Sequence, residues 1–442
     1  MRDARVNRAE GAYRALTPAG FGLVWAVSLL LGASRRELRS RVGEVPAAGS
    51  PLVWFHGASA GEMVAALKLA DLLRGSGRRF TAAFTTTNRA GIDLVARLAP
   101  PDHVATLVPW DAPRWVARSF DRWRPRALFL VETELWPNLV LEAWRRSIPV
   151  LVVSGRIYPR DLARYRAIRP LIRPTLERLS AIVVQSEVER ERFVHLGAPA
   201  ERCIVGGNLK HLATEQTSGG SGFLARRNSP PAVVFGSVHR DELRAVFSAL
   251  DRTAAGPPAL HRHRPRRDPR CVGAPPRAII APRHPSSVSA IMRAAARRGW
   301  IALRSSEAAP DATWDLLVLD RMGELSSAYA NAAVAVVGGG FGRHGGHNPL
   351  EPVMLGTPVM AGRDLDHFAD DAERLARATP EAIVDARALG TQLAAWLEDP
   401  ALRGDILARQ RAALPCSQEI AARYLAALAP WLDGRDRGEV EP

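Results

Sequence analysis

The stretch WFHGASAGEMVAALKLADLL, residues 54–73, changes its hydrophobic pattern over a few positions. An apolar run ends at His56, a turn of small residues follows, and a helical pattern then begins that carries Glu62 in its first turn. A buried strand that passes through a short turn into a helix is the βα unit of a parallel sheet. The stretch therefore predicts an α/β fold with a polar turn at the carboxyl end of a strand.

The same alternation of apolar runs and helical patterns continues along the chain. In the first half, further strand candidates lie at 80–86, 127–131, 148–154 and 181–186. In the second half, they lie at 232–237, 278–284, 316–320 and 333–340. Two α/β halves of similar size predict two doubly wound domains whose ligands bind at the carboxyl ends of the strands, facing a cleft.

Composition shifts place the domain boundaries. Residues 211–231 are small, polar and end in prolines, so they predict an interdomain linker. The stretch 251–277 is rich in Arg and Pro and lacks periodicity, so it predicts a surface loop. The predicted order is a basic and apolar segment (1–44), a first domain (45–210), the linker (211–231), a second domain (232–415), and a C-terminal helix and tail (416–442).

The charge of the chain favours anionic partners. A net charge of +15 and a pI near 10.9 allow nucleic acid, a phospholipid surface or a phosphorylated substrate. Basic residues are spread without regular aromatic interleaving, which argues against nucleic acid. Nearly all are arginine, because lysine occurs only at Lys68 and Lys210. Three widely separated cysteines favour a reducing compartment, and no cluster predicts a metal site.

An uncharged run of apolar residues lies near the N-terminus, at 16–33, with arginines on both sides. Its 18 residues are borderline for a membrane span, which needs about 20. Pro18, Gly20 and Gly22 weaken its first turns, so an interfacial anchor fits at least as well. The alternative is a buried first helix of a soluble protein.

A glycine-rich stretch, VVGGGFGRHGGHNPLEPVMLGTPVMAG at 336–362, follows a predicted buried strand. Glycines allow a ligand to approach the main chain. Asn348 suits an N-cap, Pro349 the first helical position, and Glu351 a capping box, so a helix N-terminus that favours phosphate should follow. This pattern predicts a nucleotide site, and a capping role alone is the alternative for Glu351.

Charged residues follow several of the predicted strands. Glu62 could act as a general base, with a helix N-terminus lowering its pKa, or could serve only as a favourable first-turn residue. Glu132 and Glu134 follow the strand at 127–131 and could either cap the next helix or face the same cleft as Glu62. Lys210 lies beside the linker, where an ammonium could neutralise a leaving phosphate.

Seven ordered motifs together carry a resemblance to a known family: GASAGE, VETELWPN, QSEVERERFVHLGA, GGNLK, APRHP, MGELSSAYA and GGHNPLEP. They closely resemble the 3-deoxy-D-manno-octulosonic acid (Kdo) transferases of lipopolysaccharide synthesis. The resemblance implies a GT-B architecture of two Rossmann-like domains with a cleft and an N-terminal membrane-anchor helix. It also implies CMP-Kdo as donor substrate, no separate cofactor, inverting transfer to the lipid A precursor, and the cytoplasmic face of the inner membrane.

Site residues follow from the same resemblance. Glu62 matches the family's proton acceptor, while Glu132 and Lys210 match positions that stabilise the transition state. The positions that match CMP contacts are Pro282, Arg283, Met322, Gly323, Glu324, Asn348, Pro349, Leu350 and Glu351. Departures from the family pattern include Gly57 and Ala60 in the first motif. The alternatives are a GT-B transferase using another sugar nucleotide such as a UDP-sugar, a nucleic-acid-binding protein, and a catalytically idle scaffold.

Overall fold

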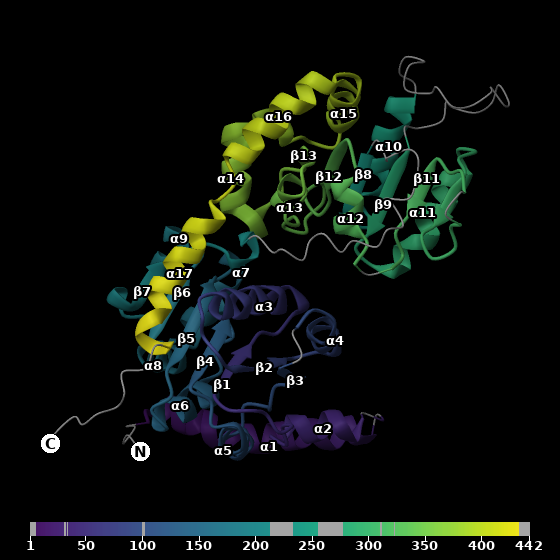
Figure 1. Ribbon diagram of the computed structural model, residues 1–442. Coiled ribbons are helices and arrows are strands. Elements are labelled where there is room, and N and C mark those ends of the chain that lie inside the picture. The colour runs from purple at the N-terminus through teal and green to yellow at the C-terminus, as the bar shows by residue number, and fades with distance from the viewer. Residues whose placement is uncertain are drawn as a thin grey trace. The chain divides into compact units, whose positions relative to one another are not determined.

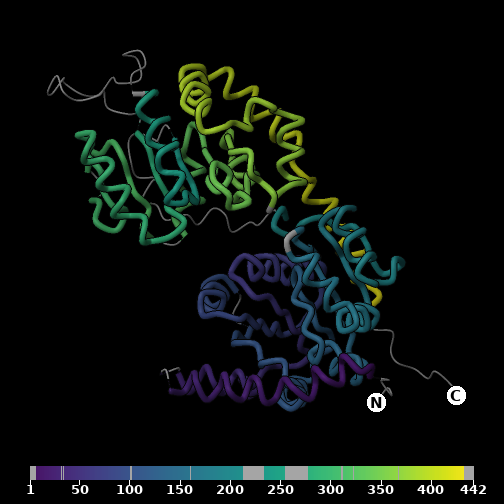
Figure 2. The backbone as a smooth tube through the Cα atoms, turned by 180° about the vertical axis from the view of Figure 1, so that it is seen from behind, coloured from purple at the N-terminus to yellow at the C-terminus, as the bar shows by residue number. Residues whose placement is uncertain are grey.

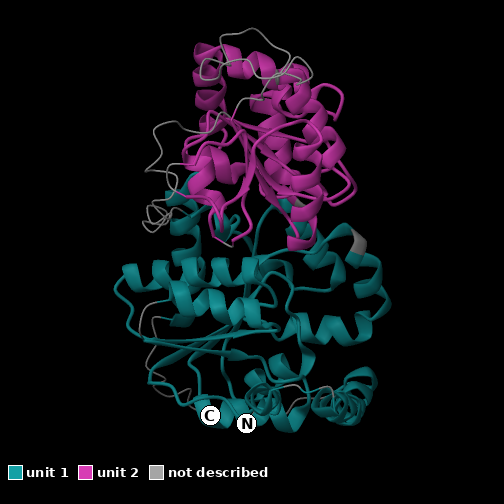
Figure 3. Ribbon diagram, turned by 90° about the vertical axis from the view of Figure 1, so that its right-hand side faces the viewer, with its two compact units in different colours: residues 1–214, 415–442 teal, residues 215–414 magenta. Residues whose placement is uncertain are grey.

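The computed structural model describes residues 6–30, 32, 34–99, 102–212, 233–254, 277–309, 312–321 and 323–432. It divides into two compact units, residues 1–214 with 415–442 and residues 215–414, which Figure 3 colours separately. Nearly all of the predicted linker 211–231 and most of the predicted loop 251–277 lie outside the described residues. Residues 251–254 are not part of a loop, because they end helix α10 (Leu243–Ala254).

Unit 1 contains a seven-stranded parallel sheet with the order β3-β2-β1-β4-β5-β6-β7. The order reverses between β1 and β4, as in a doubly wound fold, and helices cover the sheet (Figure 1). The strands are β1 (Leu52–His56), β2 (Thr81–Thr86), β3 (His103–Leu107), β4 (Ala127–Val131), β5 (Val150–Gly155), β6 (Ala181–Val184) and β7 (Cys203–Val205). The helices are α1 (Arg8–Leu30), α2 (Arg35–Arg41), α3 (Ala60–Gly75), α4 (Arg89–Leu98), α5 (Pro113–Trp123), α6 (Pro137–Arg145), α7 (Pro159–Ala167), α8 (Arg169–Glu177), α9 (Glu187–Leu196) and α17 (Ser417–Leu432), with short 3-10 turns η1 (Ala200–Arg202) and η2 (Leu209–His211).

Both faces of this sheet are buried, which explains why its central strands are continuously apolar. Successive side chains of a strand point to opposite faces, so Trp54 and Phe55 enter two different core clusters. The ring of Phe55 stacks on Phe84 and Phe129, with centroids 5.3 Å and 5.1 Å away. The sheet is thereby fixed from both sides, and the polar turns are left at its carboxyl edge.

Unit 2 contains a six-stranded parallel sheet with the order β10-β11-β9-β8-β12-β13. The strands are β8 (Val233–Val238), β9 (Ala278–Pro282), β10 (Ala302–Arg304), β11 (Leu316–Val318), β12 (Val334–Val337) and β13 (Val359–Ala361). The helices are α10, α11 (Val288–Ala296), α12 (Leu325–Ala330), α13 (Leu350–Met354), α14 (Ala369–Ala378), α15 (Leu389–Glu398) and α16 (Pro400–Ala412), with 3-10 turns η5 (Pro285–Ser287), η6 (Asp366–Phe368) and η7 (Pro380–Ala382). Two parallel α/β units confirm the predicted fold class to this extent.

The N-terminal helix α1 rests on unit 1 along one side. The Tyr13 hydroxyl donates to Asp111 at 2.9 Å, and the Phe21 ring stacks on Trp110 with centroids 5.9 Å apart. Large apolar side chains elsewhere on the helix are exposed, including Leu16 at 70% and Leu23 at 68%. Among the described residues, no helix has the length and apolar character needed to cross a membrane. The membrane-anchor role stays a prediction, as does the cleft.

The C-terminal helix α17 belongs to unit 1, and Figure 2 shows it in yellow along the teal part of that unit. The buried hydroxyl of Tyr424 accepts a hydrogen bond from Ser154 N and donates one to Gly207 O, both at 2.9 Å. Ser154 has a left-handed φ of 52°, a conformation that costs energy in a non-glycine residue. Tyr424 therefore joins the end of β5 to the turn that carries Lys210.

We expect Tyr424→Phe to lower the free energy of unfolding by about 1–3 kcal/mol, because a buried N–H and a buried carbonyl both lose their partner. Urea unfolding monitored by circular dichroism measures this change. Tyr165→Phe is the matched control, since its hydroxyl donates a longer bond, 3.4 Å to Thr133 O, and is only partly buried. Equal stabilities for wild type and Tyr424→Phe would contradict the bridging role.

Candidate active site

The predicted catalytic residues of unit 1 lie at the carboxyl ends of its central strands. β1 ends at His56 and leads through a turn to Glu62, β4 leads to Glu132, and the segment after β7 carries Lys210. β1 and β4 are neighbours in the sheet, and their parallel ends share one edge. Residues far apart in sequence are thereby brought together within one unit.

Glu62 is fixed against the turn that precedes it. Ser59 caps α3, accepting from Glu62 N at 3.3 Å and donating its hydroxyl to Glu62 Oε1 at 3.0 Å. The N–H of Ala58 donates to Glu62 Oε2 at 2.5 Å. A Cβ at Gly57 would lie 2.8 Å from the Cβ of Glu62, so glycine at this position leaves room for the side chain. The predicted position in the first turn of a helix is confirmed.

The protonation of Glu62 differs from the sequence expectation. Burial, together with the nearby carboxylates of Glu132 and Glu134, raises the pKa of Glu62 to about 8, although the bonds from Ala58 and Ser59 act in the opposite direction. The expectation that the helix N-terminus would lower this pKa is wrong, because desolvation and like charges outweigh it. A carboxylate poised near neutral pH is suited to general base catalysis.

Glu132 and Lys210 form a short ion pair, with 2.7 Å between Oε1 and Nζ. Burial alone would lower the pKa of Lys210, but the Glu132 carboxylate more than compensates and raises it. The ammonium therefore stays charged. It also lies beside Glu62, since a Cβ at Gly61 would be 3.8 Å from Lys210 Nζ. The structure thus brings all three predicted catalytic residues together.

The other lysine of the chain supports this pair. Lys68 Nζ donates to Lys210 O and Leu212 O, each at 2.6 Å. Asn208 Oδ1 accepts from Lys210 N at 2.9 Å. These contacts hold the 3-10 turn η2, so Lys68 positions the main chain from which the Lys210 side chain extends.

Two residues that the sequence did not single out also lie here. The guanidinium of Arg156 stacks over the Tyr158 ring, 4.3 Å from its centroid. Burial raises the pKa of the Tyr158 hydroxyl, and the charge of Glu132 adds to this effect. Both residues follow β5, the neighbour of β4. Their place just after a strand was one signal that could have found them.

Glu134 does not cap helix α6, in contrast to one sequence alternative. Its Oε2 accepts from Trp136 Nε1 at 2.8 Å and lies 3.3 Å from His56 Nε2. Although burial opposes it, the contact with His56 lowers the pKa of Glu134. Asp111 caps α6 instead, accepting from Asn138 N at 3.0 Å and Leu139 N at 2.9 Å. Glu132 and Glu134 are thus free of the capping role, and both act on the charge of Glu62.

The predicted nucleotide residues lie in unit 2 at strand ends and helix starts. Pro282 ends β9, Arg283 follows it, Gly323 (φ 93°) and Glu324 precede α12, and Asn348 and Pro349 precede α13. Met322 lies outside the described residues. Asn348 Oδ1 accepts from Leu350 N at 3.0 Å, but Pro349 takes the N-cap position, so helix α13 begins one residue later than predicted.

Glu351 departs from the predicted capping box. Helix α13 begins at Leu350, and its N-cap residue, Pro349, makes no side-chain capping bond. The Glu351 carboxylate instead accepts a hydrogen bond from the Ser326 hydroxyl at 2.8 Å. This bond joins the start of α13 to α12, so two of the motifs matched to CMP contacts are neighbours.

The glycine-rich turn is packed partly against its own unit. The buried carboxylate of Glu242 accepts from the N–H groups of His239, Gly339 and Phe341 at 2.8–2.9 Å. A Cβ at Gly340 would lie 2.9 Å from the Cα of Gly362. Glycine at position 340 is therefore needed for packing against the Gly362 main chain, whether or not a ligand also approaches the turn.

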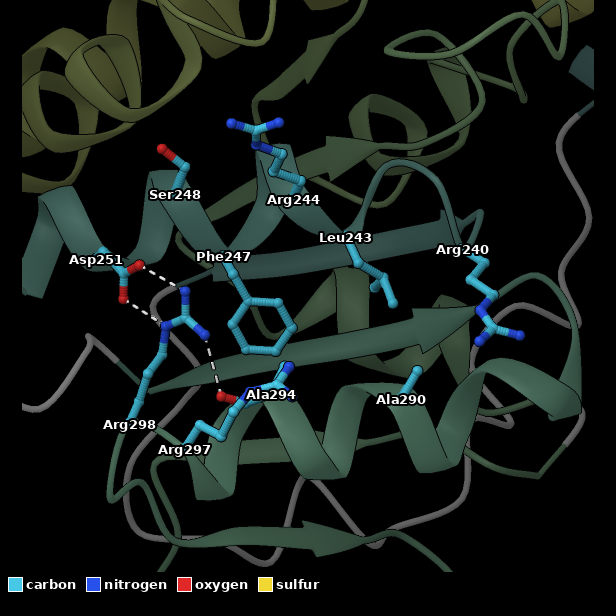
Figure 4. Close-up of a pocket in the computed structure, with 10 residues that line it drawn as sticks. All are labelled: Arg240, Leu243, Arg244, Phe247, Ser248, Asp251, Ala290, Ala294, Arg297 and Arg298. Atoms are coloured by element: carbon cyan, nitrogen blue, oxygen red, sulfur yellow. Dashed lines mark hydrogen bonds and ion pairs between the residues drawn. The ribbon is translucent and has the colours of Figure 1, made fainter.

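A surface hollow of about 440 Å³ lies between α10 and α11 (Figure 4). Arg240, Arg244 and Arg297 line it, while Arg298 makes a two-bond ion pair with Asp251 at 2.7 Å and 2.8 Å. None of the predicted site residues lines this hollow.

The chain is similar to known proteins along most of its length. Residues 36–213 match the family model described as 3-Deoxy-D-manno-octulosonic-acid transferase (kdotransferase). A 3-deoxy-D-manno-octulosonic acid transferase of Bordetella pertussis is 29% identical, covering 97% of this chain and 94% of the relative. A 3-deoxy-D-manno-octulosonic acid transferase of Haemophilus influenzae is 26% identical, covering 76% of this chain and 77% of the relative. The chain is thus similar to the Kdo transferases, over residues 36–213 for the family model and over nearly its whole length for the Bordetella relative.

The family match covers the part of the chain in which Glu62, Glu132 and Lys210 lie. Among solved structures, Anabaena HepE in complex with UDP and glucose aligns over 86% of this chain and 99% of its own, with a TM-score of 0.55 and 14% identity. At this identity the likeness shows the fold alone. It agrees with two parallel-sheet α/β units of the GT-B kind.

The raised pKa of Glu62 has a measurable consequence for stability. The folded state holds a proton on Glu62 up to about pH 8, whereas the unfolded chain releases it near 4.5. As pH rises between these values, ionisation of Glu62 lowers the free energy of the unfolded state but not that of the folded state. Glu62 therefore lowers the free energy of unfolding in this range. We expect Glu62→Gln to become progressively more stable than wild type from about pH 5 to pH 8, reaching on the order of 1–3 kcal/mol.

Urea unfolding at several pH values measures this difference. Glu191→Gln, which changes an exposed carboxylate on α9, is the control for the general effect of removing one charge. A stability difference that stays constant with pH would show that Glu62 is not protonated in the folded protein.

Proposed function

We propose that this protein transfers Kdo from CMP-Kdo to a lipid A precursor, with inversion at the sugar carbon and with Glu62 as general base. The single observation that carries the proposal is the constellation of Glu62, Glu132 and Lys210 at one sheet edge, in a chain that resembles the Kdo transferases. The named activity of the Bordetella and Haemophilus relatives supports it.

Each group of the constellation has a role in such a transfer. An inverting displacement needs a base that takes the proton of the acceptor hydroxyl as it attacks, and Glu62 is poised near neutral pH for this step. Negative charge develops on the departing phosphate, and a fixed ammonium such as Lys210 stabilises it. Glu132 keeps that ammonium charged and oriented.

The donor contacts proposed for unit 2 are Pro282, Arg283, Met322, Gly323, Glu324, Asn348, Pro349, Leu350 and Glu351. The Ser326 to Glu351 bond supports one shared surface for the segments before α12 and α13. Arg283 offers a guanidinium suited to phosphate. A donor with a single phosphate requires less neutralising charge than a pyrophosphate donor, so we propose neither a metal nor a separate cofactor.

The proposed acceptor is amphiphilic, and helix α1 suits an anionic membrane surface. Its exposed Leu16, Leu23 and Leu30 could enter the headgroup region, and the exposed Arg35 and Arg36 of α2 could contact lipid phosphates. We therefore propose that the protein acts at the cytoplasmic face of the inner membrane. Arg41 is a weaker candidate for lipid contact, since its guanidinium donates to Val108 O at 3.1 Å.

Purified protein incubated with CMP-Kdo and a tetra-acylated lipid A precursor should yield lipid products heavier by one or more Kdo units, as measured by mass spectrometry. We expect Glu62→Ala to lower the rate by about 10²–10⁴-fold. The value of kcat/KM for the wild type should rise with pH up to about 8, because the base must be ionised in the free enzyme.

The control variant is Glu187→Ala, which removes an exposed carboxylate of α9. Unchanged transfer by Glu62→Ala would remove the proposed base. Transfer from a UDP-sugar with none from CMP-Kdo would favour the alternative, a GT-B transferase with another donor.

Lys68 tests the positioning of the lysine pair. We expect Lys68→Met to lower kcat about 10–100-fold. The turn that carries Lys210 loses two hydrogen bonds in this variant, so the Lys210 ammonium shifts away from its position. The KM values for both substrates should change far less. Lys68→Arg keeps hydrogen-bond donors and should retain more of kcat. A loss of stability with an unchanged kcat would show that Lys68 is only structural.

A further inference from the structure

Four histidines gather around the glycine-rich turn of unit 2. His239 follows β8, His284 follows β9, and His344 and His347 lie in the turn itself. The His239 ring stacks on His344 with centroids 3.7 Å apart and planes 6° apart, and it lies parallel to His347 at 5.2 Å. The His284 ring stands edge-on to His239 at 5.7 Å. None of these side chains has a role in the function proposed above.

The hydrogen bonding within this cluster restricts its protons. Nε2 of His239 and Nε2 of His347 are 2.9 Å apart. A hydrogen bond between two ring nitrogens needs one donor and one acceptor, so these two nitrogens share a single proton. A second proton at this contact would place two N–H groups against each other. Protonation of both Nε2 atoms therefore requires the two rings to separate, and otherwise a further proton on this pair must go to an Nδ1 atom.

The stacking of the His239 ring on the His344 ring also disfavours a positive charge on both rings. Burial lowers the pKa of His239 and the neighbouring His344 lowers it further, while Glu242 acts in the opposite direction. Two imidazolium rings whose centroids are 3.7 Å apart would repel each other. In the protein without an anion, the cluster thus holds fewer positive charges than four histidines could carry.

The carboxylates around the cluster already accept hydrogen bonds. Asp241 Oδ1 lies 2.9 Å from His344 Nε2, and Glu242 accepts three main-chain N–H groups. Asp364, after β13, accepts from Gly345 N at 3.1 Å. Arg240, Arg283 and Arg343 are adjacent in sequence to His239, His284 and His344. These three arginines equal the three carboxylates in number, so the protonation of the histidines decides the net charge of this group.

We infer that the histidine cluster His239, His284, His344 and His347 is a proton-linked anion site, which takes up a proton when a phosphate or carboxylate group binds. An anion beside imidazole favours the protonated ring, and a protonated ring in turn favours the anion, because the two binding events are thermodynamically coupled. The inference deepens the proposed function, since CMP-Kdo carries both a phosphate and a sugar carboxylate.

The coupling predicts how affinity depends on pH. If one proton is taken up, anion affinity rises by up to about tenfold for each unit by which pH falls, between the pKa values of the free and the occupied cluster. The Asp241 contact places His344 at the outer end of the cluster, where its ring is partly exposed. Replacing His344 should therefore change proton uptake without disturbing the core of the unit.

Isothermal titration calorimetry at about pH 7 in buffers of different ionisation enthalpy counts the protons taken up on binding. The probes are the methyl phosphodiester of CMP, cytidine, free Kdo and sulfate. The diester and sulfate keep a fixed charge near neutral pH, so their proton uptake comes from the protein. The variants are His344→Gln, His239→Gln as a second cluster variant, and His195→Gln, an exposed histidine of α9, as the matched control.

We expect proton uptake with the diester and none with cytidine if the phosphate occupies the site, and uptake with free Kdo if the carboxylate does. His344→Gln should lose at least half of that uptake, and His195→Gln none. Uptake with sulfate but no binding of the diester or Kdo would support the anion site while overturning the proposed donor. Binding of the diester, Kdo or sulfate without proton uptake, or equal uptake in His344→Gln and wild type, would overturn the inference, as would the absence of binding by all three.

Discussion

The ion pair between Lys210 and Glu132 is the contact on which the site of unit 1 depends. A buried ammonium keeps its charge only beside a carboxylate, and the 2.7 Å contact provides this. The ion pair forms only if the main chain of Glu132 and the main chain of Lys210 are both held in fixed positions. Glu132 adopts a left-handed φ of 58° directly after β4, and the turn of Lys210 is held by Lys68 and, through Gly207, by Tyr424. Helix α17, about 200 residues further along the chain, is thus part of the support of the site.

This constraint explains the use of lysine in a chain that otherwise uses arginine. A compact ammonium on a flexible stem can lie between two carboxylates, whereas a guanidinium presents a wide planar fork. Lys68 places one ammonium within 2.6 Å of two carbonyl oxygens, and Lys210 places another beside Glu132 and Glu62. Both lysines therefore serve one site, and their rarity in the sequence was a usable signal.

Sequence reasoning succeeded where burial leaves a local pattern. The strands β1, β4 and β12 are fully buried apolar runs, and their boundaries agree with the prediction within a few residues. It missed β3 and β10, which are short edge strands of intermediate burial, and β13, which has only three residues. It missed Arg156 and Tyr158 because only the strand order places β5 next to β4. It also gave Glu62 the wrong pKa direction, because desolvation depends on packing that no local pattern shows.

The glycine-rich turn shows that a sequence pattern can have a structural cause as well as a functional one. Its pattern suggested that a ligand must approach the main chain, yet Gly340 is also required by the neighbouring Gly362, and Gly339 donates its N–H to the buried Glu242. A motif can therefore satisfy internal packing and ligand binding with the same residues. The four histidines come from three separate segments of unit 2, and only the fold places their rings in contact. Their shared proton is a property of that contact, because a lone histidine in a loop would titrate independently of the others.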